Sequence, residues 1–269
     1  MEAAKQQVKD FWNDASCGEN LYLKGEDEIA QFNNQLKVRY ELEPFILPFA
    51  EFEKFKGKKV LEIGVGLGAD HQMWAQSGAI MSGCDLTERA VEHTSRRMKL
   101  LNLQSELRTA DAENLPYADA SFDAVYSWGV IHHSPNTPKA ASEIYRVLKP
   151  GGEARVMIYH KHSMVGYMLW LRYGLLAVKP ARSLNYIYSH YLESPGTKAY
   201  TVKEAQQLFK QFSKVEIDTL LGHGDLLTSK AGQRHEGALL NIARKVFPRF
   251  FIRTFLPKHG LFMLVKLVK

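Results

Sequence analysis

The regular alternation of short apolar runs with amphipathic segments constrains the fold of this chain more than any other feature of its sequence. Apolar runs that predict β-strands lie at 58–64, 79–86, 105–110, 122–127 and within 148–159. Helical segments follow at 68–77, from Thr87, and after Thr137, where Thr137 is the expected N-cap and Pro138 the first helical residue. This rhythm predicts an open α/β sheet of parallel strands, which binds ligands in the loops after its strands.

The alternation lapses after Tyr159 and later resumes. The aromatic-rich stretch 161–200 predicts one or two helices and a loop, and we expect it to be an insertion. Thr201 and Glu204 then form a capping box, and two more strands are expected at 214–221 and within 260–268, the last after a helical segment disturbed at Pro248. We therefore expect an N-terminal helical cap at 1–50, a ligand-binding core at 51–160, the insertion at 161–200 and the C-terminal part of the core sheet at 201–269.

Composition excludes several classes of protein. The 269 residues are 45% hydrophobic and 24% charged, which is typical of a folded globular chain. Cys17 and Cys84 form no CxxC pair and no histidine has zinc-type spacing, so we expect neither a disulfide nor a metal site. The start, MEAAKQQVKDFW, lacks the apolar run of a signal peptide, and no stretch approaches the roughly 20 apolar residues of a spanning helix. We expect a cytoplasmic protein.

The turn after the first strand is rich in glycine. Gly64, Gly66 and Gly68 follow Glu62 and let the backbone approach a ligand beside a helix N-terminus. The turn alone also satisfies the dinucleotide pattern GxGxxG/A, with Asp85 at the distance of a ribose-binding acid, so a dehydrogenase and a tight turn without ligand remain alternatives. The glycines are followed by Asp70, whereas a pyrophosphate would favour a cation there.

The rest of the core separates these alternatives. The ordered segments GVGLGAD, CDLTERAVEHTSRR, TADAENLPYADASFDAVYSWGVIHH and RVLKPGGEARVMIY resemble the successive motifs of class I S-adenosylmethionine-dependent methyltransferases, in particular the ubiquinone and menaquinone methyltransferase type (methyltransferase type 11). The resemblance covers about residues 57–160. It implies a Rossmann-like α/β sheet of seven strands with the seventh antiparallel, and S-adenosylmethionine as cofactor with S-adenosylhomocysteine as product.

The resemblance also implies roles for individual residues. The cofactor-binding positions that match the family motifs are Glu62, Gly64, Gly66, Gly68, Asp85, Leu86, Asp111, Ala112, Glu113, Ser127 and Trp128. In the family the glycine turn flanks the methionine part of the cofactor, the acid after the second strand holds the ribose, and the segment after the third strand reads adenine. Elementary chemistry agrees, because the two adjacent ribose hydroxyls suit one carboxylate acceptor and the adenine amino group is a donor.

Three residues are candidates for the chemistry of methyl transfer. The departure of a methyl group from a sulfonium leaves a neutral group, so the protein mainly aligns the acceptor and removes its proton. His132 and His133 follow the fourth strand and are candidate bases, although paired histidines in a loop often serve only as positional or solvated groups. Tyr22 lies in a segment similar to those that fold over the cofactor, where it either covers the cofactor or packs the cap.

The insertion is the expected acceptor site. Its aromatic residues, with Tyr159 before it, predict a small, apolar or lipid-like acceptor; they are Tyr159, Tyr167, Trp170, Tyr173, Tyr186, Tyr188 and Tyr191. We expect Trp170 and Tyr186 to be the first to test, and Met164, Met168, Leu171 and Leu175 to pack the insertion onto the sheet. An RNA methyltransferase or a non-catalytic cofactor-binding protein are the alternative functions, although no added RNA-binding module is visible and we expect no nucleic-acid partner. The sequence does not specify an oligomeric state.

The excess positive charge lies near the end of the chain. The formal net charge is +6, and from Thr201 onward there are 12 Lys or Arg against 5 Asp or Glu. Basic residues alternate there with phenylalanines at Arg244, Lys245, Phe247, Arg249, Phe250, Phe251, Arg253 and Phe255. We expect a solvated basic face over a packed apolar face, with peripheral contact to an anionic membrane as the alternative.

Overall fold

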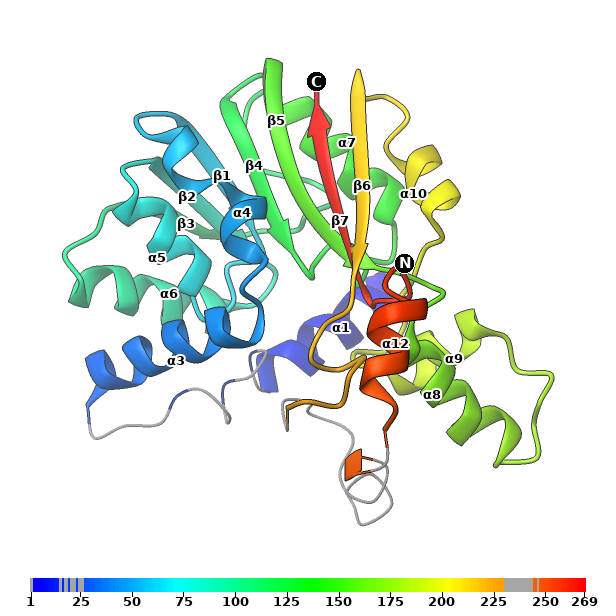
Figure 1. The fold of residues 1–269 in the computed structure, drawn as a ribbon. Helices are drawn as coiled ribbons and strands as arrows, with labels where there is room; N and C mark the ends of the chain where they lie inside the picture. Colours follow the sequence, from blue (N-terminus) through cyan, green and yellow to red (C-terminus); the bar gives the residue numbers. More distant parts are fainter. Residues whose placement is uncertain are drawn as a thin grey trace.

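A seven-stranded sheet forms the centre of the molecule (Figure 1). The computed structural model describes residues 2–14, 16, 19, 23, 27–229, 244–245 and 247–269. Tyr22 and Cys17 therefore lie outside the described residues, as does most of the helical segment expected before Pro248. The strands are β1 (Lys59–Ile63), β2 (Ile80–Asp85), β3 (Ser105–Thr109), β4 (Phe122–Trp128), β5 (Leu148–Tyr159), β6 (Lys214–Leu220) and β7 (Phe262–Val268).

The order of the strands is β3-β2-β1-β4-β5-β7-β6. β1 to β5 pair in parallel, and β7 runs antiparallel to both β5 and β6. The predicted Rossmann-like sheet with an antiparallel seventh strand is confirmed. The order reverses at β1, so the loops after β1 and β4 leave the same edge of the sheet on either side of a crevice, which is where open α/β sheets bind ligands.

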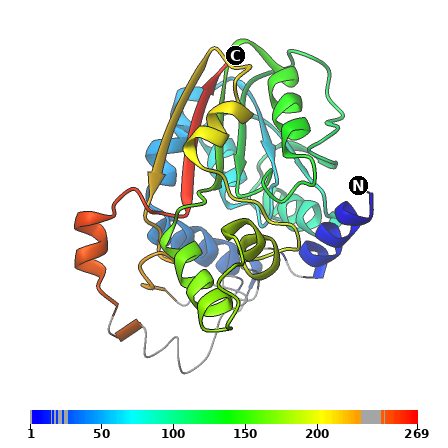
Figure 2. The same cartoon turned by 90° about the vertical axis from the view of Figure 1, so that its right-hand side faces the viewer.

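Helices cover both faces of the sheet (Figures 1 and 2). They are α1 (Glu2–Asp14), α3 (Glu28–Leu42), α4 (Ile46–Ala50), the 3₁₀ helix η1 (Phe52–Phe55), α5 (Ala69–Gln76), α6 (Glu88–Leu100), α7 (Thr137–Val147), α8 (Met164–Trp170), the π-helix η2 (Leu171–Leu175), α9 (Leu184–Tyr191), α10 (Val202–Leu208) and α12 (Arg249–Phe255). Side chains of a strand alternate between its faces. Thus Leu61 and Ile63 of β1 pack in one apolar cluster with α7 and α10, whereas Val60 packs in another with α4 and α5.

Local sequence signals account for several helix starts. Thr87 caps α6 by accepting a hydrogen bond from the Ala90 amide, and Thr201 and Glu204 form the predicted capping box of α10. The predicted start of α7 was wrong by one residue. Asn136 is the N-cap, because its side chain accepts from the Lys139 amide, and Thr137 already belongs to the helix.

The two ends of the insertion lie next to each other. The Tyr200 amide donates to the Tyr159 carbonyl at 2.8 Å and the Lys161 amide donates to the Tyr200 carbonyl at 2.9 Å, so a short parallel bridge closes the stretch that contains α8, η2 and α9. This stretch lies below the sheet in Figure 1, as do α1 and α12. None of the described helices is long and apolar enough to cross a membrane.

Candidate functional site

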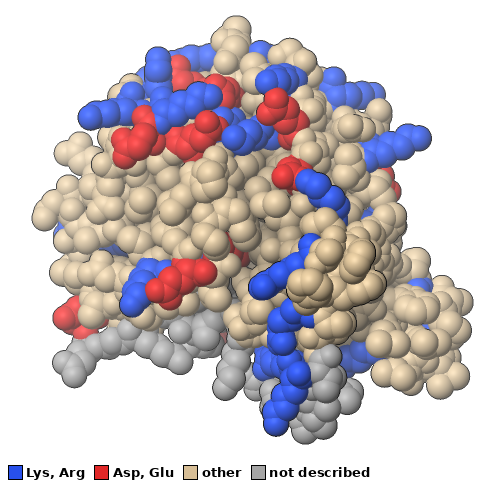
Figure 3. Space-filling view, viewed as in Figure 1, with Lys and Arg blue, Asp and Glu red and all other residues tan. Residues whose placement is uncertain are grey.

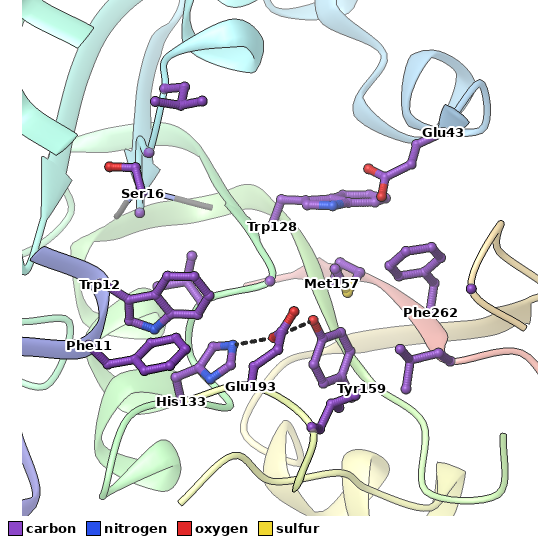
Figure 4. A pocket seen from close by; sticks show the side chains of 18 of the residues that line it. Phe11, Trp12, Ser16, Glu43, Trp128, His133, Met157, Tyr159, Glu193 and Phe262 are labelled. Carbon is purple, nitrogen blue, oxygen red and sulfur yellow. Dashed lines mark hydrogen bonds and ion pairs between the residues drawn. The ribbon is translucent and has the colours of Figure 1, made fainter. Parts of the chain in front are cut away.

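A cavity of about 1310 Å³ lies at the edge of the sheet where the parallel strands end. The loops after β1, β2, β3 and β4 line one part of it, and α1, α3, α8, the 192–193 segment and the start of β7 line the other. Figure 4 shows part of this lining, with Trp12 and His133 near one end and Trp128, Met157 and Phe262 near the other. One continuous cavity thus joins the predicted cofactor loops to the insertion.

The glycine turn shapes the cofactor end of the cavity. Gly64, Gly66 and Gly68 all have positive φ, at 83°, 52° and 76°. A side chain at Gly64 would place its Cβ 2.1 Å from Cγ2 of Val130, whereas a Cβ at Gly66 would meet no atom within 4 Å. Gly64 is therefore required by packing, while Gly66 leaves open space toward the cavity that a bound molecule can fill.

Asp85 closes this end of the cavity after β2. Its carboxylate accepts hydrogen bonds from the Gly66 amide at 3.2 Å and from the amide and hydroxyl of Thr87 at 2.9 Å each. Burial raises the pKa of Asp85 even though these donors oppose the shift. A carboxylate held in this way has further lone pairs for a donor that reaches it from the cavity.

The acids after β3 have different roles. Asp111 lies in the cavity wall and its side chain binds the Lys5 ammonium of α1 at 2.6 Å. Glu113 also binds Lys5 at 2.6 Å, but it is buried and does not belong to the cavity wall. Its other oxygen accepts from the Ser134 hydroxyl at 2.5 Å and the Asn136 amide at 2.7 Å. Glu113 therefore fixes the loop before α7, and Asp111 is the acid of this segment that faces the cavity.

Glu62 is held beneath the glycine turn. Its carboxyl lies 2.8 Å from Nδ1 of the fully buried His71, whose Nε2 lies 2.7 Å from the Ser105 hydroxyl. Burial raises the pKa of Glu62 well above its usual range and lowers the pKa of His71 to about 3. Both shifts favour the uncharged forms of the two groups.

Asp70 joins the N-terminal cap to the core. Arg39 of α3 donates two hydrogen bonds to its carboxylate, at 2.7 and 2.6 Å, and the hydroxyls of Tyr40 and Tyr126 donate at 3.0 and 2.8 Å. Burial alone would raise the pKa of Asp70, but the Arg39 guanidinium lowers it below its usual range. This bidentate pair fixes α3 against the first turn of α5, and both residues line the cavity.

A polar cluster lies at the junction of the core and the insertion. Tyr159 donates a hydrogen bond to Glu193 Oε2 at 2.8 Å, and the same oxygen lies 3.4 Å from His133 Nε2, as Figure 4 shows. On its other side, His133 Nδ1 lies 2.8 Å from the Ser194 hydroxyl and 3.1 Å from the Thr197 hydroxyl. The sequence pattern predicted His133 but not Glu193, because no local motif connects residues 60 positions apart.

The remaining predicted residues differ in their access to the cavity. Trp128 lines it and stacks on Phe45 with 6.0 Å between ring centroids, and Leu86 and Ala112 line it too. Ser127 and His132 are fully buried outside its wall, and neither has a hydrogen-bond partner for its side chain among the described residues. His132 packs against Tyr159 with 4.0 Å between ring centroids, and burial lowers its pKa well below the usual range.

The acceptor end is lined mainly by aliphatic side chains. From the insertion it receives Val165, Met168, Leu169, Leu171, Arg172, Leu176, Leu192 and Glu193. Among the aromatic residues expected there, Tyr159 lines the cavity but Trp170 and Tyr186 do not. Trp170 donates its indole N–H to the Arg182 carbonyl, and Tyr186 stacks on His190. The expectation that Leu171 and Leu175 pack onto the sheet was also wrong, because both are largely exposed.

Comparisons with known proteins agree with this geometry. Residues 61–156 match the family described as methyltransferase domain. Demethylmenaquinone methyltransferase of Tropheryma whipplei is 29% identical over 170 residues, which cover 58% of this chain and 70% of the relative. Methyltransferase GfsG of Streptomyces halstedii is 28% identical over 181 residues, which cover 66% of this chain and 59% of the relative. Residues 61–156 form a class I S-adenosylmethionine-dependent methyltransferase domain.

A solved structure extends the likeness in fold to nearly the whole chain. Phosphoethanolamine N-methyltransferase 2 of Haemonchus contortus, solved with S-adenosylhomocysteine, aligns with a TM-score of 0.60 and 16% identity over 97% of this chain and 59% of that one. The cofactor of the domain is S-adenosylmethionine. The site has the features that this cofactor requires, namely open space at Gly66 and acceptor carboxylates at Asp85 and Asp111 on the cavity wall.

Proposed function

We propose that this methyltransferase transfers a methyl group from S-adenosylmethionine to a small, largely apolar acceptor bound between α1, Trp128 and the insertion. The observation that carries the proposal is the single cavity, which continues from the glycine turn into a chamber lined by aliphatic and aromatic side chains. Apolar walls select ligands by shape and by the area that they bury. The name of the Tropheryma whipplei relative gives an acceptor of this kind, a quinone, for that protein.

We propose cofactor-binding roles for the residues of the glycine turn, for Asp85 and Leu86, and for Asp111 and Ala112. Asp85 would accept from the ribose hydroxyls and Asp111 from the adenine amino group, while Gly66 leaves space for the methionine part. When bound, S-adenosylmethionine supplies a methyl group on a sulfonium centre. Glu62 also lines the cavity beside the glycine turn, while Glu113 and Ser127 support this site from beneath its wall through their contacts or their packing.

We propose that the polar cluster of Tyr159, Glu193 and His133 orients the nucleophilic group of the acceptor. It places hydrogen-bonding groups in the cavity wall beside the apolar side chains of the insertion, so a hydroxyl or amine on an otherwise apolar molecule finds hydrogen-bond partners there. The cluster also receives the proton that the acceptor loses on methylation. His132, packed behind His133, positions this cluster.

We also propose that the enzyme meets an anionic membrane surface through α12 and the end of η2. The expectation of a packed apolar face along α12 was wrong, since Phe250 and Phe255 are 83% and 64% exposed. Leu176 and Val178, after η2, are 65% and 86% exposed. Lys and Arg side chains run down the lower part of the face in Figure 3, in the region of α12. The expectation of a cytoplasmic location stays a prediction.

A labelled-methyl assay tests the proposed function. Calorimetry with S-adenosylhomocysteine and with NAD is followed by incubation with labelled S-adenosylmethionine and a panel of quinones, sterols, polar amines and folded RNA. We expect binding of S-adenosylhomocysteine alone, label in apolar acceptors, and loss of transfer but not of cofactor binding in Glu193→Gln. Labelling confined to RNA or to polar amines would show that the acceptor class is wrong.

A further inference from the structure

The polar cluster places a ring nitrogen of His133 opposite a carboxylate oxygen of Glu193. The Thr197 hydroxyl donates its proton to the Ser194 carbonyl at 2.7 Å, so its oxygen is an acceptor toward His133 Nδ1 at 3.1 Å. In the tautomer that donates from Nδ1 to this oxygen, Nε2 of the neutral imidazole presents a lone pair. This lone pair points toward Glu193 Oε2, 3.4 Å away. In that tautomer a cation between the two groups satisfies both atoms.

The neighbouring His132 favours a metal ion over a proton as the cation between His133 and Glu193. His132 is fully buried, and neither of its ring nitrogens has a partner among the described residues, which is rare for buried polar atoms. One potential ligand atom from each of His132, His133 and Glu193 lies within 4.8 Å of the other two. A proton on His133 would satisfy the pair and leave His132 unpaired, whereas one metal ion satisfies all three side chains.

We propose that His132, His133 and Glu193 bind a divalent transition-metal ion at the acceptor end of the cavity. Two imidazoles and one carboxylate are a common ligand set for zinc and for non-haem iron(II). Metal–ligand bonds of about 2.0–2.2 Å place neighbouring ligand atoms roughly 3–3.5 Å apart, so the separation between His133 and Glu193 already fits. A small rotation of the His132 ring completes the set.

The surroundings of the site match those of a metal centre. Ligating histidines are oriented by hydrogen bonds from the other ring nitrogen, as Ser194 and Thr197 hold His133 Nδ1. The Tyr159 hydroxyl holds the carboxylate of Glu193. His133 and Glu193 line the cavity, so the open coordination position faces the acceptor chamber. The sequence-based expectation of no metal relied on ligand spacing along the chain and did not include Glu193.

Cobalt(II) is a direct probe of this site. Chelator-treated, untagged protein is titrated with Co²⁺ in the absence of cofactor and acceptor, and the visible d–d absorption is recorded, followed by competition with Zn²⁺. We expect one ion per chain, displaced by Zn²⁺. His132→Ala and Glu193→Gln should each weaken binding at least about tenfold, and Tyr159→Phe by about tenfold. His190→Gln, an exposed histidine outside the cluster, is the matched control and should bind as the wild type does.

The Co²⁺ titration tests the metal site separately from the proposed acceptor class. Because neither cofactor nor acceptor is present, a wrong acceptor class does not change the Co²⁺ titration. Glu193 is partly exposed, so Glu193→Gln should fold normally, and circular dichroism checks this for His132→Ala. Wild-type protein without saturable Co²⁺ absorption would overturn the proposal. So would unchanged affinity in correctly folded Glu193→Gln, because the ion would then be bound elsewhere.

Discussion

Single residues at the cofactor end have separable tasks. Gly64 and Gly66 share a left-handed backbone, but the first lies against Val130 and the second beside open space. The Asp85 carboxylate accepts hydrogen bonds from backbone amides of the protein and still faces the cavity. Stability and cofactor binding should therefore respond differently to changes at neighbouring positions.

The two glycines form a matched pair for mutagenesis. Gly66→Ala adds a methyl group in free space, so we expect a loss of about 1 kcal/mol in unfolding free energy from the left-handed backbone, with a clear loss of cofactor affinity. Gly64→Ala should lose a further 1–3 kcal/mol, roughly, because its Cβ overlaps Val130. Thermal unfolding and calorimetry with S-adenosylhomocysteine measure the two effects. Normal cofactor affinity in Gly66→Ala would contradict the assignment of this turn.

Asp85 should contribute more to cofactor binding than His133. Asp85→Ala removes the acceptor that we propose for the ribose hydroxyls, and we expect a loss on the order of 1–3 kcal/mol in binding free energy. His133→Ala, at the acceptor end, is the control and should keep nearly full affinity. Calorimetry with S-adenosylhomocysteine compares the variants, and equal affinity of wild type and Asp85→Ala would remove Asp85 from the site.

At the scale of the elements, the buried carboxylate of Asp225 joins three segments on the acceptor side of the cavity. Asp225 accepts hydrogen bonds from the backbone amides of Val165 in α8, Gly222, and Leu261 just before β7, at 3.2, 3.0 and 2.8 Å. These three segments come from distant parts of the chain. Burial raises the pKa of Asp225 to about 6, although the three amides oppose the shift.

The raised pKa predicts a dependence of stability on pH. Because the folded pKa of about 6 exceeds the ordinary value of 3.8, the contribution of Asp225 to stability is largest below the ordinary value and is lost as pH rises through 6. A shift of about two pKa units corresponds to roughly 3 kcal/mol. Denaturant unfolding of wild type and Asp225→Asn between pH 4 and pH 8 should show the variant gaining relative stability as pH rises. A constant difference would exclude a raised pKa.

The insertion should determine the affinity for the acceptor. Met168 of α8 lines the cavity, so Met168→Ala should raise the acceptor KM severalfold through lost apolar contact, at about 25 cal/mol per Å² of buried area. Tyr186→Ala is the matched control, since Tyr186 belongs to the same insertion but faces away from the cavity. Steady-state kinetics measure KM, and calorimetry should show unchanged cofactor affinity in both. An equal rise in KM in Tyr186→Ala would move the acceptor site elsewhere.

The sequence was most informative where function depends on local pattern. The alternation of strands and helices, the glycine turn and Asp85 follow from short-range signals, and the seven-stranded sheet agrees with the prediction. Contacts between distant segments had no such signal. Glu193 meets His133 only because the insertion folds back onto the core, and the orientation of Trp170 and Tyr186 depends on partners within the insertion. The prediction from aromatic content alone that these two residues line the acceptor end of the cavity was therefore wrong.

At the scale of the whole molecule, the acceptor cavity reaches two segments that carry exposed apolar side chains. Leu171 and Arg172 of η2, and Phe247 and Pro248 before α12, belong to the cavity wall. Both helices also carry exposed apolar residues. Large exposed apolar patches of this kind mark interaction surfaces, and nearby Lys and Arg favour an anionic partner.

Vesicle co-sedimentation tests this surface. We expect binding to vesicles that contain phosphatidylglycerol, weaker binding at high salt, and little binding to pure phosphatidylcholine. The double variant Phe250→Ser/Phe255→Ser should lose most of the binding because it removes two exposed rings. Ile80→Ser, which changes an exposed apolar residue at the start of β2, is the control. Retained binding by the double variant, or binding to RNA in place of vesicles, would contradict a membrane-facing surface.

The bridge between His160 and Tyr200 has an evolutionary consequence. Since the insertion departs from and returns to adjacent positions, a different segment with the same two ends can replace it without altering the register of β5 against β7. Acceptor preference can then change by exchange of a cassette while the cofactor loops stay untouched. A laboratory chimera that joins residues 1–160 and 200–269 of this chain to a foreign segment would inherit the methyl donor from one parent and the acceptor from the other.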